Sequence, residues 1–87
     1  MLKIQRSSNG RVVFTLSGEI GEQEIAELGA LIRAEEKGQS VVLNLRDVTL
    51  VSRQGVCFLE RCETDGVTLE NCPAYVREWI MRNRHGS

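Results

Sequence analysis

Residues 41–62, VVLNLRDVTLVSRQGVCFLERC, contain the junction on which the fold of this chain depends. Residues 41–45 form a β-branched apolar run, which predicts a buried strand with both faces covered. Apolar character returns at residues 49–51. From residue 53 the apolar side chains of Val56, Leu59 and Cys62 recur at helical spacing, which predicts a helix over 53–64 that buries them. The polar segment 52–55 therefore lies where a strand passes directly into a helix.

The residues before this junction predict a β-hairpin followed by a helix. Asn9-Gly10 is a strong hairpin signal between short alternating runs at residues 2–4 and 11–16. Residues 22–37 then follow helical spacing, with acidic side chains in the first turn and Gly38 as a C-terminal stop. The buried stripe of this helix would comprise Ile25, Leu28, Leu31 and Ile32.

The residues after the junction predict a short strand at 67–69 and a third helix that begins at Pro73 and buries Val76 and Ile80. Strands that alternate with helices imply crossover connections and parallel pairing. We therefore expect an α/β fold, a small mixed sheet with an N-terminal β-hairpin and helices packed on it. Residues 1–87 would form one domain, with a core over about 2–81 and a frayed tail at 82–87.

Composition and charge narrow the possible functions. The net charge is −1, with 41% hydrophobic and 26% charged residues, so no overall basic surface points to nucleic acid as a partner. No stretch approaches the roughly 20 apolar residues of a membrane span, and the N-terminus lacks an apolar core of signal-peptide length. We expect a cytoplasmic protein with no direct membrane insertion.

The sequence also lacks the usual marks of catalysis and of cofactor binding. It contains neither a dinucleotide-binding fingerprint nor a phosphate-binding loop, and no pair of carboxylates is placed for acid–base work, so we expect no enzyme activity and no cofactor. The spacing of Cys57, Cys62 and Cys72 matches neither a disulfide framework nor a zinc site, and small buried hydrophobes are the expected role. A redox or ligand-binding protein that uses Cys57 and Cys62 remains an alternative.

The polar segment has both a structural and a functional interpretation. Ser52 is a good N-cap, which explains it fully and leaves Arg53 and Gln54 as solvated loop residues. The free N–H groups and the positive end of the helix dipole also make this terminus attractive to an anion, and Arg53 would strengthen that field.

Three separated segments resemble STAS domains, the sulfate-transporter and anti-sigma-factor-antagonist family. Residues 41–56 are similar to the central strand, loop and helix of the family, where an Asp-Ser-Ser/Ala-Gly motif follows the strand. The segment FTLSGEI at residues 14–20 resembles the family's strand exit before its long helix, and VTLENCP at 67–73 resembles the strand and proline before its final helix. The resemblance covers about residues 2–80 and implies the same small mixed-sheet fold.

The resemblance also implies a degenerate phosphorylation motif. In anti-sigma-factor antagonists of this family, a partner kinase phosphorylates the serine that precedes the motif glycine. The family's Asp corresponds to Ser52, its two serines to Arg53 and Gln54, and its glycine to Gly55. Gln54 occupies the phosphoacceptor position and has no hydroxyl group.

We therefore expect a non-enzymatic, bacterial protein-interaction module that resembles anti-sigma-factor antagonists. Its partner would be an anti-sigma or kinase-like protein, with the alternative that the chain is a STAS-like accessory subunit of an ABC-type transport complex. Homodimerisation is possible. The expected partner-binding residues lie in the loop and on the following helix: Ser52, Arg53, Gln54, Gly55, Cys57, Phe58 and Arg61.

Overall fold

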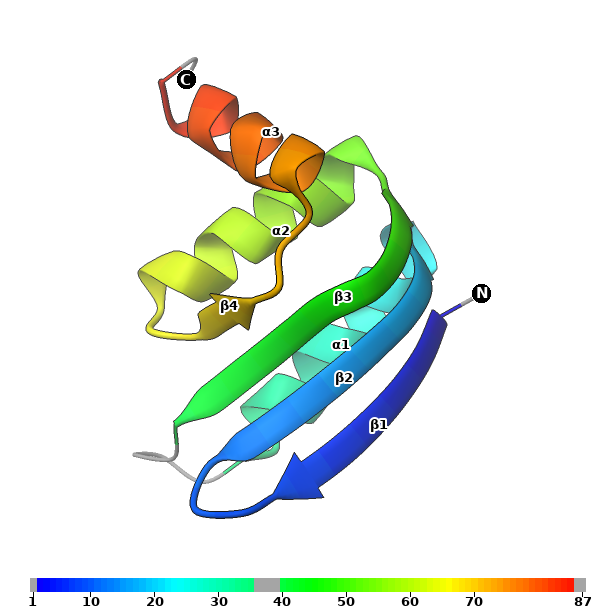
Figure 1. Cartoon of the computed structure of the whole chain (residues 1–87), viewed down its shortest axis with the longest axis vertical. Coiled ribbons are helices and arrows are strands. Elements are labelled where there is room, and N and C mark those ends of the chain that lie inside the picture. The colour runs from blue at the N-terminus through cyan, green and yellow to red at the C-terminus, as the bar shows by residue number, and fades with distance from the viewer. Residues whose placement is uncertain (1, 36–39, 86–87) are drawn as a thin grey trace.

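The computed structural model describes residues 2–35 and 40–85. Within these ranges the elements follow in the order β1 (Leu2–Ser8), β2 (Val12–Ile20), α1 (Glu22–Arg33), β3 (Val41–Val51), α2 (Arg53–Thr64), β4 (Thr68–Glu70) and α3 (Ala74–His85). The sheet has the strand order β1-β2-β3-β4, with β1 antiparallel to β2 and parallel pairing of β2 with β3 and of β3 with β4 (Figure 1). The predicted mixed α/β sheet with an N-terminal hairpin is confirmed.

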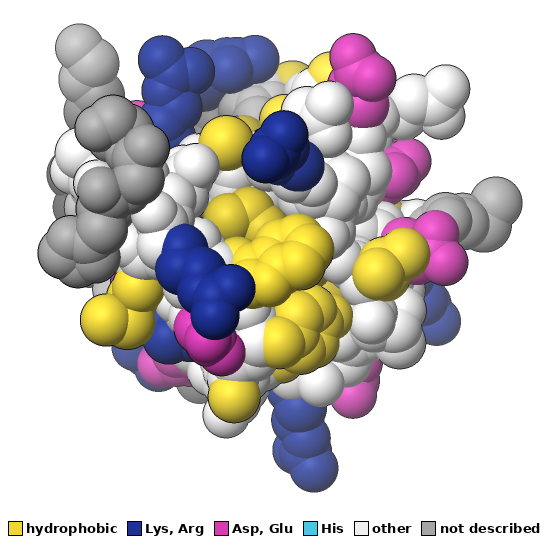
Figure 2. Space-filling view, turned by 90° about the horizontal axis from the view of Figure 1, so that it is seen from above, with side chains coloured by type: hydrophobic (Ala, Val, Ile, Leu, Met, Phe, Trp, Pro, Cys, Tyr) yellow, Lys and Arg dark blue, Asp and Glu magenta, His cyan; other side chains and the backbone are white. Residues whose placement is uncertain are grey.

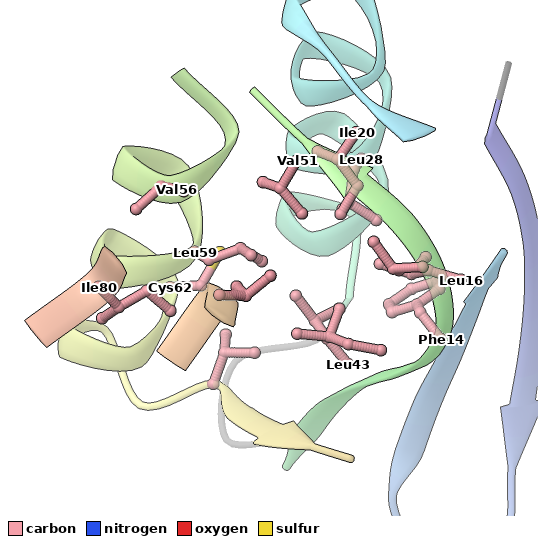
Figure 3. Close-up of a cluster of buried hydrophobic side chains, with 14 of the residues drawn as sticks. Phe14, Leu16, Ile20, Leu28, Leu43, Val51, Val56, Leu59, Cys62 and Ile80 are labelled. Carbon is pink, nitrogen blue, oxygen red and sulfur yellow. The ribbon is translucent and has the colours of Figure 1, made fainter. Parts of the chain in front are cut away.

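The helices bury one face of this sheet. The crossovers through α1 and α2 step in the same direction across the sheet, so their common right-handed sense places both helices on the same face. Alternate β2 residues Phe14 and Leu16 point to that face and share one buried cluster with Leu28 of α1 and Leu59 of α2. Figure 3 shows labelled core side chains from the helices and from the sheet, with Leu43 and Leu59 between α2 and the strands. The third helix packs on α2 through Val76, Ile80 and their neighbours.

Two irregularities make β3 longer than its apolar runs suggest. The register changes between Thr15 and Ser17 and again between Gly18 and Glu19, and each change leaves one extra residue on β3. Because of these bulges, buried side chains recur every third residue along this part of β3 instead of every second. Leu45, Val48 and Val51 are therefore buried, while the residues between them are exposed. The strand is therefore continuous through Arg46-Asp47, where the sequence shows an apparent break.

Helix α1 is shorter than predicted. Helix α1 ends at Arg33 with Ala34 as its C-cap, before the predicted end at Lys37, and Lys37 and Gly38 lie outside the described residues. Leu31, predicted to be buried, is 37% exposed because the core contacts of α1 centre on Leu28.

The C-terminal helix continues through residues 82–85, where a frayed tail was expected. Polar contacts fasten it to α2: Arg77 donates two hydrogen bonds to the Glu63 carboxylate at 2.8 and 3.0 Å, and Arg84 approaches the same carboxylate at 2.7 Å. The side-chain amide of Asn83 also donates to Glu60. These charge-assisted bonds explain why the polar end of the chain remains helical.

Candidate functional site

Ser52 joins the end of β3 to the start of α2. Its backbone N–H donates to the carbonyl oxygen of Ile20 at 2.9 Å, and its Oγ accepts a hydrogen bond from the Gly55 N–H at 3.0 Å. The predicted N-cap is confirmed, and such a cap stabilises a helix by about 1 kcal/mol relative to alanine. The hydroxyl is therefore engaged within the turn, which fixes the direction in which α2 leaves the sheet.

Gly55 brings the first turn of α2 into close contact with the ends of β2 and β3. A Cβ atom at this position would lie 2.6 Å from Cγ1 of Val51 and 3.0 Å from the carbonyl oxygen of Ile20. Gly55 is buried, so its role is to permit this approach rather than to contact a partner through a side chain. It positions the surface residues on either side of it.

Five of the seven expected partner-binding residues line one groove between α1 and α2, which we call the α1–α2 groove. The groove has a volume of about 690 Å³. Its lining includes the expected residues Arg53, Gln54, Cys57, Phe58 and Arg61. Residues that the sequence did not single out complete it: Glu22, Ile25, Glu60 and Thr64. Their contribution depends on how α1 packs beside α2, which residue spacing alone does not reveal.

The three cysteines occupy different environments. Cys62 is buried, and this burial, with a smaller effect from the nearby Asp65 charge, raises the pKa of its thiol to about 11. Burial also raises the pKa of Cys72. Cys57, expected to be a buried hydrophobe, is exposed instead, and its Sγ lies 3.8 Å from Oδ1 of Asn83. Because a neutral buried thiol is a poor nucleophile, the geometry gives no support to a Cys57–Cys62 redox pair.

A second groove lies between α2 and α3 and was not anticipated from the sequence; we call it the α2–α3 groove. It has a volume of about 590 Å³ and is lined by Val51, Ser52, Arg53, Val56, Trp79, Arg82 and Asn83. The available signal was the spacing of Tyr75, Trp79 and Arg82, which places them on one stripe of α3 beside the buried stripe.

Across residues 2–35 and 40–85, no group of three or more His, Cys, Asp or Glu side chains is arranged to hold a metal ion. No helix in the described ranges combines the length and the apolar character that a membrane crossing requires.

Comparison with known proteins gives a structural likeness. No family model matches the sequence, and no curated protein matches it. The fold is similar to that of the anti-sigma factor antagonist SpoIIAA in its unphosphorylated form, with 17% identity, 94% of this chain and 83% of that chain covered, and a TM-score of 0.63. An uncharacterized protein with a SpoIIAA-like fold from Shewanella loihica has 11% identity, coverages of 98% and 78%, and a TM-score of 0.58.

A third similar structure, Mglu, has 28% identity and a TM-score of 0.57, with 83% of this chain but only 19% of the Mglu chain covered. This chain thus matches a small part of a larger protein in that case. At these sequence identities, the similarity between this chain and the three structures concerns the fold. The four-stranded mixed sheet and its helices therefore adopt a SpoIIAA-like fold.

Proposed function

We propose that this STAS-like domain is a non-enzymatic protein-interaction module of a bacterial cytoplasm, and that the α1–α2 groove is its partner-binding face. The observation that carries the proposal is the convergence of Arg53, Gln54, Cys57, Phe58 and Arg61 on this one groove. Ser52 and Gly55 contribute indirectly: Ser52 caps α2, and Gly55 permits the close contact between α2 and the sheet, so together they fix the helix that carries the groove residues.

The composition of the groove suits a protein partner. Ile25 and Phe58 are half-buried apolar side chains that pack against the core, and charged side chains of both signs, such as Glu22 and Arg61, surround them. An apolar centre with a polar rim is the usual anatomy of a protein–protein interface. The guanidinium groups of Arg53 and Arg61 have no hydrogen-bond or ion-pair partner among the described residues, so both are available to a carboxylate on the partner.

Gln54 defines how this module would differ from a phosphorylation switch. It is exposed in the first turn of α2, at the position that the STAS resemblance assigns to the phosphoacceptor. An amide cannot form the phosphate ester, so we propose that binding at this face is constitutive rather than controlled by phosphorylation of residue 54.

The proposal is tested by photo-cross-linking in the native host. A benzophenone amino acid is placed at Gln54 in the groove and, as a control, at the exposed Lys3 on the outer strand β1. We expect one protein to be captured from position 54 and not from position 3, and the adduct to be lost when Arg61→Glu is added. Equal capture from both positions, or an adduct unaffected by Arg61→Glu, would remove this groove from the interface.

The identity of the captured protein separates the two partner classes. An anti-sigma or kinase-like protein supports the antagonist-like role. An ATPase or another transporter subunit supports the accessory role in an ABC-type complex.

A further inference from the structure

We propose that the α2–α3 groove is a second docking surface, and that it binds a segment of a partner protein which combines apolar side chains with carboxylates. This groove adjoins the α1–α2 groove, because its Asn83 contacts Cys57 and Glu60 of that groove, but the inference does not depend on the function proposed there. Arg53, at the start of α2, is the main side chain that borders both.

The apolar part of the groove is built on the core. Val51 and Val56, each 4% exposed, form its floor, and Trp79 forms a wall while remaining 45% exposed. The neighbouring Tyr75 is 41% exposed, and its hydroxyl donates to the carbonyl oxygen of Thr49 at 3.1 Å, which fixes the ring at the end of β3. Seen from above, hydrophobic side chains gather at the centre of this end of the molecule with Lys or Arg side chains beside them (Figure 2).

An exposed tryptophan over a floor of buried valines is more informative than a lone surface hydrophobe. Single apolar side chains on a surface are common, whereas tryptophan in a hollow is typical of the few residues that supply most of the binding energy at an interface. The groove is also preformed, because Nη1 of Arg77 donates to both carboxylate oxygens of Glu63 and so holds α3 against α2. A partner would therefore bind without ordering the helices first.

The charge of the groove selects the chemistry of the partner. Arg53 has no partner among residues 2–35 and 40–85, and the positive end of the α2 dipole adds to its field. Arg82 contacts Glu78 at 2.7 Å, but both side chains are mostly exposed, and such a pair is weak enough to exchange for a carboxylate of the partner. None of the described residues that line this groove is acidic, whereas Glu22 and Glu60 line the other groove.

The same charges disfavour a second copy of this chain as the occupant. In a two-fold symmetric dimer each groove would face its own counterpart, so Arg53 and Arg82 of one copy would approach those of the other. Like charges brought together at an interface oppose association. An acidic, apolar segment of a different protein has neither problem.

The test uses the intact chain and a phage-displayed library of random 12-residue peptides without tryptophan. Trp79 is the sole tryptophan of the chain, so its fluorescence reports directly on the occupancy of the groove. We expect selected peptides to be enriched in Asp or Glu next to Leu, Ile or Phe, and to shift the Trp79 emission to shorter wavelength on titration. Peptide affinity should fall as salt is raised.

Matched variants locate the binding. Arg53→Glu and, with a labelled peptide, Trp79→Ala should each weaken binding by about tenfold or more, which is the effect of losing one hot spot. The controls Arg46→Glu, at an exposed position of β3, and Met81→Ala, which removes a 51% exposed side chain of α3 outside the groove, should keep the affinity within about twofold. Circular dichroism confirms that each variant is folded.

Several results would overturn the proposal. These are the recovery of no peptide that perturbs Trp79, the selection of basic peptides, and unchanged affinity in Trp79→Ala. Concentration-dependent dimerisation that shifts the Trp79 emission would assign the groove to a second copy instead. Since Trp79 does not line the α1–α2 groove and Arg61 does not line this one, variants of these two residues distinguish failure here from failure of the proposed function.

Discussion

Replacement of Gly55 by alanine tests the contact that positions α2 on the sheet. In an unconstrained helix, alanine is more stable than glycine by about 0.5–1 kcal/mol. Here the new methyl group would lie 2.6 Å from a methyl of buried Val51 and 3.0 Å from the Ile20 carbonyl oxygen, and neither atom is on a flexible side chain that can move away. Overpacking of this kind costs about 1–3 kcal/mol.

We therefore expect Gly55→Ala to lower the free energy of unfolding by about 1–2 kcal/mol, or the Tm by about 5–15 °C for a domain of this size. The measurements are urea and thermal unfolding followed by circular dichroism.

Gly29 in α1 is the matched control. It is also a buried helical glycine, but its added Cβ would meet Nη1 of Arg33 at 3.5 Å and Cε1 of Phe58 at 3.6 Å, which are ordinary contacts. Gly29→Ala should therefore raise the stability by about 0.5–1 kcal/mol. If the two alanine variants change stability by the same amount and in the same direction, the close packing at Gly55 is wrong.

Three further predictions concern the same junction and the cysteines of α2. In urea unfolding, Ser52→Ala should lower the stability by about 1 kcal/mol through loss of the cap, while Ser52→Asp, which can still accept a hydrogen bond from the Gly55 N–H, should remain within about 0.5 kcal/mol of the parent protein. Equal losses in both variants would refute the capping role. Because burial raises the thiol pKa of Cys62 from 9.0 to about 11, the unfolded chain loses this proton at lower pH than the folded chain does. The free energy of unfolding should therefore decline as the pH rises from about 9 to 11, and denaturant titrations of Cys62→Val should show a shallower decline across that range. At pH 8, alkylation followed by mass spectrometry should modify exposed Cys57 well before Cys62, and equal rates would contradict the described burial.

Local signals in the sequence were sufficient to predict α2. Its predicted range, its cap at Ser52 and its buried residues Val56, Leu59 and Cys62 agree with the structure, because a cap and a helical period are properties of a few neighbouring residues. The hairpin and the order of the remaining elements followed from similar local signals.

The path of β3 and the end of α1 could not be predicted in the same way. Each bulge in β3 depends on its pairing with β2, so the sequence predicted a strand only over residues 41–45 and showed renewed apolar character at 49–51 without joining the two. Helix α1 follows its predicted period only as far as Arg33, and Leu31 faces outward, since burial of a helical stripe depends on how far the neighbouring elements extend over it.

The two grooves could not be predicted from residue spacing either. Spacing placed Arg53, Gln54, Cys57, Phe58 and Arg61 on one helix, but it did not show that α1 completes a groove beside them. It also did not show that Trp79 lines a groove between α2 and α3, because that depends on how α3 packs on α2. Contacts between helices distant in sequence determine both features.

The binding affinity of the protein captured at position 54 tests the central claim most directly. Gln54→Asp and Gln54→Asn give side chains of nearly the same size and shape that differ in charge and in the amide donor, and a carboxylate in the first turn of α2 is compatible with the helix dipole, so folding should be retained in both. Calorimetric titration should show that Gln54→Asp weakens binding by about tenfold or more, because its charge must be desolvated in the interface, while Gln54→Asn stays within about twofold of the parent protein. Equal affinities for the aspartate and asparagine variants would contradict the account.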